Sequence, residues 1–333
     1  MKITSGEPSQ RRHFCEEKIG LLDRIFAKTE ERRPSFNRRM FDEDFAKLFH
    51  YTNHRCKNIF EIVSNNEEIL KWLLSNVKTR YSRYSIQETI LDLIEEIARS
   101  LIGYGKAYYF IYEEDDDDEK KMIAIGALSP NRIFCLFNKY FQWLPKCTQR
   151  NWDKDDEEFP RELRMLDSKG IIRFHMPTSI KHMLSAQNRV LTVLDKHQFE
   201  ATNFHPIATH ENPSPTTYFD FSVWNQTQER ALYRATRETG WNGRKYDSSK
   251  RSDFFDCHRL IRFRKNQLFL RDNILCQLSS ELSRIGKNYS AGFSVDISAC
   301  DTLPSVAYLD ELEVKLSREE VGFNEVIDYC FKR

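Results

Sequence analysis

The chain has 333 residues, of which 40% are hydrophobic and 13% aromatic, and its 51 basic residues nearly balance its 50 acidic ones. This composition excludes a disordered or low-complexity chain, because it supplies ample apolar surface for one large domain or two of ordinary size. The balanced charge neither attracts nor repels a polyanion, so a claim about such a partner needs a local asymmetry.

Neither targeting segments nor cysteine motifs are evident. No run approaches the roughly 18 apolar residues that a membrane span requires, and the first residues, MKITSGEPSQRRHF, lack the apolar core of a signal peptide. The eight cysteines are scattered without a CxxC pair, which is typical of reduced thiols rather than of a zinc site. We expect a soluble cytoplasmic protein, or a virion component if a phage encodes it, with no membrane contact, metal or cofactor.

Residues 1–84 are predicted to form a helical N-terminal arm. The arm is polar and arginine-rich around ERRPSFNRRMFDEDFAKLF, and residues 65–76 are predicted to form a short amphipathic helix. Glu67 and Glu68 lie in the first turn of this helix, where the helix dipole favours acidic side chains. Docking of a protein partner by Arg11 to Arg39 of this arm is one hypothesis for its role.

A helix, a turn and a strand are predicted to follow. Isoleucine and leucine recur every three or four residues from Ile86 to Leu101, which predicts a helix that buries one face. Gly103 is the expected end of this helix, because a left-handed closing residue is cheapest as glycine. Gly105 then leads into the aromatic strand KAYYFIY.

Four short β-forming runs are separated by turn residues. The runs are KAYYFIY, MIAIGAL, RIFCLF and YFQWL. An acidic hairpin tip, Glu113 to Glu119, follows the first run, SPN (129–131) the second and NK (138–139) the third. Turn residues at these places favour hairpins, so we expect an antiparallel four-strand meander.

The rest of the chain is predicted to be mainly helical. A charged linker (150–170) precedes a strand, IIRFHM (171–176), a helix capped by residue 178 or 179, and a proline-marked loop (201–215). A helix over 222–239 ends at Gly240, and residues 253–285 carry a helical pattern of roughly 50 Å at 1.5 Å per residue, closed by Gly286. The strand AGFSVDI and a last helix, opened by the capping box SREE at Ser317, complete the chain.

The predicted fold class is therefore α+β, helix-rich, with an antiparallel four-strand meander and a long helix in the C-terminal half. The order of elements divides the chain into three regions. These are the helical arm (1–84), an α+β core with the meander (85–200), and a long-helix region with a basic patch and a C-terminal strand and helix (201–333).

The strongest local charge lies in residues 230–271, which hold twelve Lys or Arg against four acids, an excess of eight positive charges. Arg259, Arg262 and Lys265 recur at three-residue spacing along the long helix and form a band that suits phosphate contact, with Trp241 and Tyr246 nearby for stacking. A helix whose basic face pairs with acidic segments elsewhere explains the same pattern, so both interpretations stay open. The predicted DNA-binding residues are Arg244, Lys245, Lys250, Arg251, Arg259, Arg262, Arg264, Lys265 and Arg271.

Motifs for catalysis are absent or incomplete. The acidic run EEDDDDE lacks the spacing and the glycine of a calcium loop, and His205 and His210 lie beside Glu211 without the HExxH pattern of a metalloprotease. No P-loop or GxSxG motif occurs. We expect no catalytic residues. The alternative hypothesis is a metal-dependent nuclease or an effector of a bacterial anti-phage defence system that uses the acidic hairpin or the His205/His210 loop.

The order of these elements resembles the core of tailed-phage portal proteins, the ring-shaped gates through which DNA enters a capsid. The resemblance extends roughly from Glu88 to Cys330. It rests on SLIGYGKAYYFIYEE, ALSPNRIFCLFNKYFQWL and GIIRFHM, then on the arginine-bearing long helix, AGFSVDI, TLP and REEVGFNEVIDYC. The stretch TSIKHMLSAQNRV departs from the family pattern, and the chain is short, as in a degenerate, shortened or domesticated relative.

The resemblance implies a non-enzymatic protein of phage, prophage or domesticated origin. Such a protein would form a homo-oligomer, for example a ring, and would contact DNA. A phage or defence-system protein would be its partner.

Overall fold

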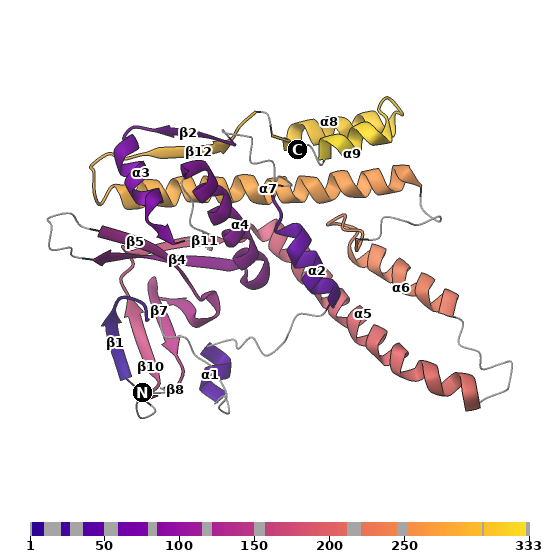
Figure 1. Ribbon diagram of the computed structural model, residues 1–333, viewed down its shortest axis with the longest axis horizontal. Coiled ribbons are helices and arrows are strands. Elements are labelled where there is room, and N and C mark those ends of the chain that lie inside the picture. The colour runs from indigo at the N-terminus through magenta and orange to yellow at the C-terminus, as the bar shows by residue number, and fades with distance from the viewer. Residues whose placement is uncertain are drawn as a thin grey trace. The chain divides into compact units, whose positions relative to one another are not determined.

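The computed structural model describes residues 2–9, 21–26, 36–49, 59–78, 85–114, 122–149, 157–211, 221–244, 252–301 and 303–330. Helices and strands are mixed along the chain (Figure 1), which confirms the predicted α+β class. The chain divides into two compact units. Unit 1 contains Met1–Arg33, Phe60–His175 and Ile274–Ser298, and unit 2 contains Pro34–Ile59, Met176–Asn273 and Ala299–Arg333. Each unit thus combines three separated stretches, and the three consecutive regions expected from the sequence stay a prediction.

Unit 1 contains two four-stranded sheets, of order β11-β4-β5-β3 and β1-β10-β7-β6, and the two-stranded pairs β12-β2 and β8-β9. Its helices are α1 (Leu21–Phe26), α3 (Glu67–Ser75), α4 (Ile86–Tyr104) and the 3-10 turn η1 (Pro130–Arg132). Its strands are β1 (Lys2–Gly6), β2 (Phe60–Ser64), β3 (Val77–Lys78), β4 (Lys106–Glu114), β5 (Met122–Leu128), β6 (Ile133–Leu136), β7 (Lys139–Leu144), β8 (Cys147–Gln149), β9 (Glu157–Phe159), β10 (Glu162–Leu166), β11 (Ile171–His175) and β12 (Val295–Ala299).

The prediction of one four-strand meander is wrong, because its strands form two hairpins in different sheets. β4 pairs with β5, and β6 pairs with β7, each antiparallel. The turn η1 separates the two hairpins. On the edge opposite to β6, strand β7 pairs with β10, which lies in the stretch predicted as a charged linker. Turn residues determine which neighbouring strands pair, but they do not determine whether two successive hairpins share a sheet.

The turn between β6 and β7 lies one residue earlier than predicted, at Phe137 and Asn138. Both residues have positive φ, 49° and 59°, which a two-residue type I′ hairpin requires at its two central positions. Asparagine adopts this conformation readily, whereas phenylalanine does so rarely. A type I′ turn has the twist that the paired strands β6 and β7 require. This requirement therefore overrides the preference of Phe137 for negative φ.

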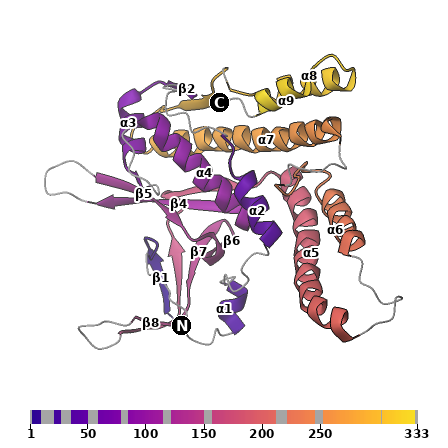
Figure 2. The ribbon, with the colours of Figure 1, turned by 45° about the vertical axis from the view of Figure 1, so that its right-hand side comes forward.

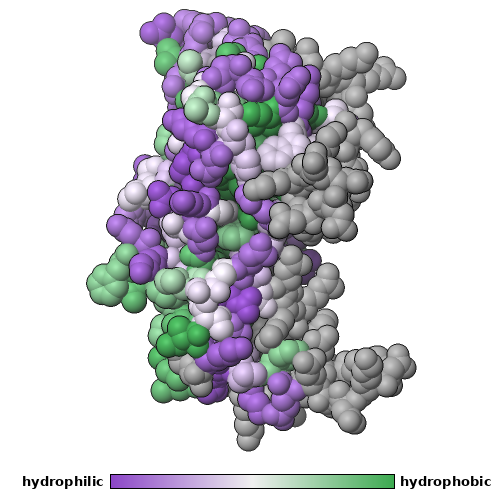
Figure 3. Space-filling view, turned by 90° about the vertical axis from the view of Figure 1, so that its left-hand side faces the viewer, coloured by the Kyte–Doolittle hydropathy of each residue, from purple (hydrophilic) through white to green (hydrophobic). Residues whose placement is uncertain are grey.

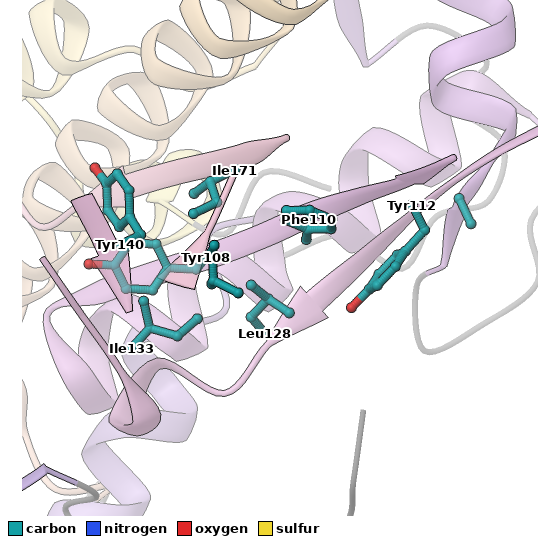
Figure 4. Packing of buried hydrophobic residues seen from close by; sticks show 9 residues of the cluster. Tyr108, Phe110, Tyr112, Leu128, Ile133, Tyr140 and Ile171 are labelled. Carbon is teal, nitrogen blue, oxygen red and sulfur yellow. The ribbon is translucent and has the colours of Figure 1, made fainter. Parts of the chain in front are cut away.

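One face of β4 contributes to a buried apolar cluster in unit 1. Tyr108, Phe110 and Tyr112 alternate on one face and are buried (Figure 4). At Gly126 of β5 a Cβ atom would lie 3.2 Å from the Tyr112 ring, so the ring covers a glycine in the neighbouring strand. The buried cluster on this face consists of Tyr108, Phe110, Tyr112, Ala124, Leu128, Ile133, Tyr140, Leu166 and Ile171.

Helix α4 has the predicted buried stripe but a different end. Ser85 caps its first turn by accepting a hydrogen bond from the Glu88 N–H at 3.2 Å. Gly105, with φ of 74°, is the left-handed closing residue. Gly103 remains within the last turn, because only the residue directly before β4 has to reverse the chain.

Side chains from the second half of helix α7 (Asp253–Gly286) bond to the outer edge of strand β11 in unit 1. Gln277 accepts a hydrogen bond from the His175 N–H at 2.8 Å and donates one to the His175 carbonyl at 2.9 Å. Glu281 accepts from the Arg173 N–H at 3.3 Å. These bonds replace the ladder that a further strand would supply.

The same half of α7 serves strand β12 through two serines one turn apart. Ser279 accepts from the Ile297 N–H at 2.8 Å, and Ser283 accepts from the Val295 N–H at 2.9 Å. Ser283 also donates to the Val295 carbonyl at 3.1 Å. Figures 1 and 2 both show β12 alongside α7, with β2 on its far side.

Unit 2 is helical in its described part. It contains α2 (Phe36–Phe45), α5 (Thr178–Glu211), α6 (Phe221–Ala235), the first part of α7, α8 (Val306–Ser317) and α9 (Phe323–Cys330). Apolar residues of α7, α8 and α9 form one buried cluster. Its members are Cys257, Ile261, Leu268, Leu309, Leu312, Leu316, Val326 and Cys330. None of the helices in the described part of the chain is long and apolar enough to cross a membrane.

Two predictions for this part of the chain are wrong. The loop expected from residue 201 is helical as far as Glu211, since a single internal proline at 206 removes one backbone donor and can be accommodated by a bend. Ser317 does not open the last helix, because it is the final residue of α8, whose own cap is Ser305. The predicted long helix and its closing Gly286 are confirmed.

Gly286 and Gly103 are a matched pair of helical glycines for a packing test. A Cβ at Gly286 would lie 2.0 Å from the buried Phe293 ring, whereas one at Gly103 meets nothing within 4 Å. We expect Gly286→Ala to lower the free energy of unfolding by about 1 to 3 kcal/mol through overpacking. Gly103→Ala should raise it by about 0.5 to 1 kcal/mol. Chemical denaturation of both variants checks this, and equal effects would contradict the packing at Gly286.

Candidate functional site

Arg259, the first arginine of the predicted basic band, is buried within unit 2 and caps the end of α6. Its guanidinium donates to the Thr236 carbonyl at 3.2 Å and to the Trp241 carbonyl, and it lies 5.0 Å from the centre of the Tyr233 ring. The last carbonyls of a helix lack intrahelical partners and carry the negative end of its dipole. The arginine therefore satisfies the C-terminal turn of α6.

The glycine predicted to end this helix is what allows the approach. Gly240 has φ of 80°, and a Cβ at this position would lie 2.3 Å from the Arg259 carbonyl oxygen. Arg262 and Asn266, the next residues along the same face of α7, donate to the carbonyls of Arg237 and Glu238, both at 3.1 Å. Three side chains on one face of α7 thus donate hydrogen bonds to carbonyls of the segment that follows α6.

Arg264 and Gln267 perform the same task for the end of α2. Arg264 is 2% exposed and donates to the Leu48 carbonyl at 2.8 Å and to the Gln267 side-chain oxygen at 3.1 Å. Gln267, which is fully buried, donates to the carbonyls of Asp44 and Lys47 at 2.9 and 3.0 Å. Phosphate has no access to a guanidinium buried in this way.

The last two cations of the predicted band also bond within unit 2. Arg271 is 4% exposed and donates to the Pro304 carbonyl at 3.1 Å. Lys265 pairs with Glu313 at 2.9 Å and with Asp310 of α8. Burial alone would lower the pKa of Lys265, but its hydrogen bonds to these two carboxylates raise that pKa above the ordinary value.

Arg244 belongs to an ion-pair cluster with the acidic end of α2. It lies 2.7 Å from Asp44 and 3.2 Å from Glu43, and the hydrogen bonds to Asp44 raise its pKa. Trp241, predicted to stack on bases, is buried, and its indole N–H donates to Asp44 at 3.0 Å. Lys245, Lys250, Arg251 and Tyr246 lie outside the described residues.

The geometry therefore favours the second of the two interpretations of the basic region. Arg244 and the predicted cations of α7 bind carbonyls or carboxylates of the same unit, and the surface role predicted for Arg259, Arg264 and Arg271 is not compatible with their burial. Helical spacing alone did not reveal this, because helix ends attract arginine just as phosphates do. Among the described residues of the predicted set, Arg262 is exposed and bonds to the Arg237 carbonyl, and it forms no ion pair with another described residue.

Three exposed arginines at the C-terminal end of α6 were not in the predicted set, although they lie in the same basic region. They are Arg230 and Arg234 within the helix and Arg237 just after it. Their spacing of four and three residues places them on adjacent parts of one face. That spacing is the signal that could have found them, but the longer helix α7 carries more cations and dominates the sequence pattern.

The candidate metal groups lie largely outside the described part of the chain. His205 and His210 fall within α5, but their side chains are not described, and most of the acidic run after Glu113 is not described either. Glu113 accepts a hydrogen bond from the Tyr289 hydroxyl at 3.0 Å. Among the described residues, no three His, Cys, Asp or Glu side chains gather as a group that could hold a metal ion.

Comparison with solved structures returns chains of gene transfer agent particles and a phage portal protein. No family model matches the chain, and no curated protein matches it. It is similar to a chain in the virion of a native gene transfer agent particle, with 11% identity, a TM-score of 0.40, and coverage of 94% of this chain and 92% of that one. A chain from the neck of such a particle, computed with C12 symmetry, has 12% identity, a TM-score of 0.40 and coverage of 86% and 85%.

A third similar structure is an HK97-family phage portal protein from Corynebacterium diphtheriae. It has 10% identity and a TM-score of 0.38, with coverage of 79% of this chain and 94% of that one. Because TM-scores below 0.5 do not establish a common function, a functional proposal has to rest on the residues of this chain.

Arg264 and Arg262 provide a paired test of buried against exposed roles on one helix. Arg264→Met leaves the Leu48 carbonyl without its buried partner and should lower the free energy of unfolding by about 1 to 3 kcal/mol. Arg262→Met, at an exposed position, should change it by less than about 0.5 kcal/mol. Urea denaturation of the two variants decides, and a larger loss for Arg262→Met would contradict the assignment.

Asp42, a buried carboxyl of α2, generates a pH prediction. Burial raises the pKa of Asp42 to about 7, against the opposing charge of Arg38 at 3.8 Å. Since the folded state holds this proton more tightly than the unfolded state, its contribution to stability is present below about pH 4 and is lost as the pH rises through about 7. The stability of the wild type relative to Asp42→Asn should therefore fall between these two pH values. A constant difference across denaturation curves in this range would show that Asp42 titrates normally.

Proposed function

We propose that this chain is a portal-like structural protein, of phage, prophage or domesticated origin, that assembles into a closed ring and contacts DNA. The observation that carries the proposal is the order of elements behind the sequence resemblance. That order is a helix, a left-handed glycine, an aromatic strand and its hairpin, then a strand feeding a helix, and finally a long arginine-bearing helix with a short strand and helices after it.

Each of these elements occurs in the described chain. Gly105 separates α4 from the aromatic strand β4, and η1 begins with Pro130 ahead of β6. Strand β11 leads into α5, and α7 is followed by β12, α8 and α9. The division of the strands between two sheets changes their pairing partners but leaves their order along the chain intact.

Self-assembly is supported by large apolar side chains on the surface of both units. Figure 3 shows, on one face, apolar side chains in patches among hydrophilic ones. A subunit contact would cover such side chains, since interface cores are rich in them. Those exposed by more than half are Ile3, Leu21, Ile25, Val63, Leu136 and Phe137 in unit 1, and Phe36 and Val193 in unit 2.

The DNA contact that we propose is weak and salt-sensitive. A protein that encloses or conducts DNA needs charges without tight specific contacts. Because many of the predicted α7 cations bond to their own unit, any such contact involves a smaller number of exposed cations. The proposal includes this DNA contact and a protein partner from a phage or a defence system. It also places the protein in the virion or in the cytoplasm.

Native mass spectrometry with negative-stain imaging tests the assembly. We expect a closed ring whose mass is a multiple of the 39.7 kDa chain. A monomer or dimer at all concentrations would contradict the ring. A second measurement incubates the protein with DNA in the presence of magnesium or manganese, and we expect the DNA to stay intact. Metal-dependent cleavage would favour the nuclease alternative.

A further inference from the structure

An open groove lies between helices α5 and α6 within unit 2. The two helices lie side by side in both ribbon views (Figures 1 and 2). The groove has a volume of about 570 Å³, which is in the range of ligand-binding sites. The described residues that line it are Val190 of α5 and Thr227, Arg230, Ala231, Arg234 and Ala235 of α6.

Two arginines that line this groove have side-chain N–H donors that no described residue accepts from. Arg230 and Arg234 are exposed, and neither side chain makes a hydrogen bond or an ion pair with the residues that the structure describes. They stand one helical turn apart, where like charges repel and destabilise the helix. The helix dipole offsets this for Arg234 in the last turn, but Arg230 lies a turn earlier, where the effect of the dipole has largely faded.

This separates the two arginines from Arg244 and from those of α7. Arg259 and Arg264 bind carbonyls, and Arg244 binds carboxylates. Arg230 and Arg234 thus combine a groove, an exposed position and donors that no described residue of the chain uses. A guanidinium presents five N–H donors in a planar fork, which matches the oxygens of a phosphate group.

The floor of the groove suits a phosphate that carries an apolar neighbour. Ala231 and Ala235 are small and one turn apart, so a ligand can approach the helix closely between the arginines, and Val190 adds an apolar lining residue from α5. A nucleic-acid backbone has this character, because deoxyribose rings, which expose C–H groups, alternate with phosphates along it.

We propose that the α5–α6 groove binds the sugar–phosphate backbone of DNA through Arg230 and Arg234. This inference rests on the proposed function and moves its DNA contact from α7 to α6. The contact reads no sequence, since guanidinium–phosphate pairs position a duplex without specifying bases.

The test is binding of a fluorescently labelled duplex of mixed sequence, measured by anisotropy over a series of salt concentrations. The variant is Arg230→Gln/Arg234→Gln. Its control, Lys181→Gln/Lys287→Gln, removes the same charge at two exposed positions that are not among the described lining residues of the groove. We expect the arginine variant to bind more weakly at low salt, with a salt slope reduced by about one for each phosphate that is no longer neutralised. The control should bind almost as the wild type does.

Three outcomes would overturn the inference. Wild-type binding in the arginine variant would remove the groove from the DNA interface. Equal losses of affinity in the arginine variant and the lysine control would show that only net charge matters. Competition by a polyglutamate peptide as effective as that by unlabelled duplex, and abolished in the arginine variant, would make the groove a site for an acidic protein segment.

Two further measurements separate this inference from the proposed function. Binding of inorganic pyrophosphate that the arginine variant abolishes, while DNA does not bind to the wild type, would overturn DNA as the source of the phosphate. Native mass spectrometry of the same variant reports assembly independently. A wild-type ring that forms but does not bind DNA would overturn the groove inference and leave self-assembly standing, whereas DNA binding through Arg230 and Arg234 by a monomer would contradict the ring alone.

Discussion

The polar side chains of helix α7 satisfy backbone groups that the surrounding elements leave without partners. A buried N–H or C=O without a hydrogen bond costs about 1 to 3 kcal/mol, and both helix ends and edge strands expose such groups. In unit 2, Arg264 and Gln267 bind the carbonyls beyond α2, and Arg259 binds those beyond α6. In unit 1, Gln277 and Ser279 serve β11 and β12. Each unit depends on its own part of this helix.

The choice of side chain follows the group that has to be satisfied. Serine and glutamine both donate and accept, so they can bond to the alternating N–H and C=O groups of an edge strand. Arginine only donates, and Arg259 and Arg264 bind carbonyls near the ends of α6 and α2. Gln267 donates to carbonyls near the end of α2, whereas Gln277 also accepts from the N–H of an edge strand.

This assignment changes what the charge of the region means. An excess of eight positive charges between residues 230 and 271 suggests a surface that attracts phosphate. Once Arg259, Arg264 and Arg271 are buried and Lys265 is paired with carboxylates of α8, little of that excess remains on α7. Among the described residues, the exposed arginines of α6 carry the more accessible part of it. Net charge over a stretch of sequence is thus a poor guide to surface potential where helix ends lie nearby.

The sequence by itself determined the features that depend on neighbours along the chain. The stripe of α4, the hairpin β4–β5 and the extent of α7 follow from periodicity, turn chemistry and closing glycines. Only the tertiary structure decided which sheet each hairpin joins, that β10 pairs with β7, and that Arg264 is buried while Arg230 is exposed. These depend on contacts between residues far apart in sequence, and a local pattern contains no information about which distant carbonyl, strand edge or helix end will meet a given side chain.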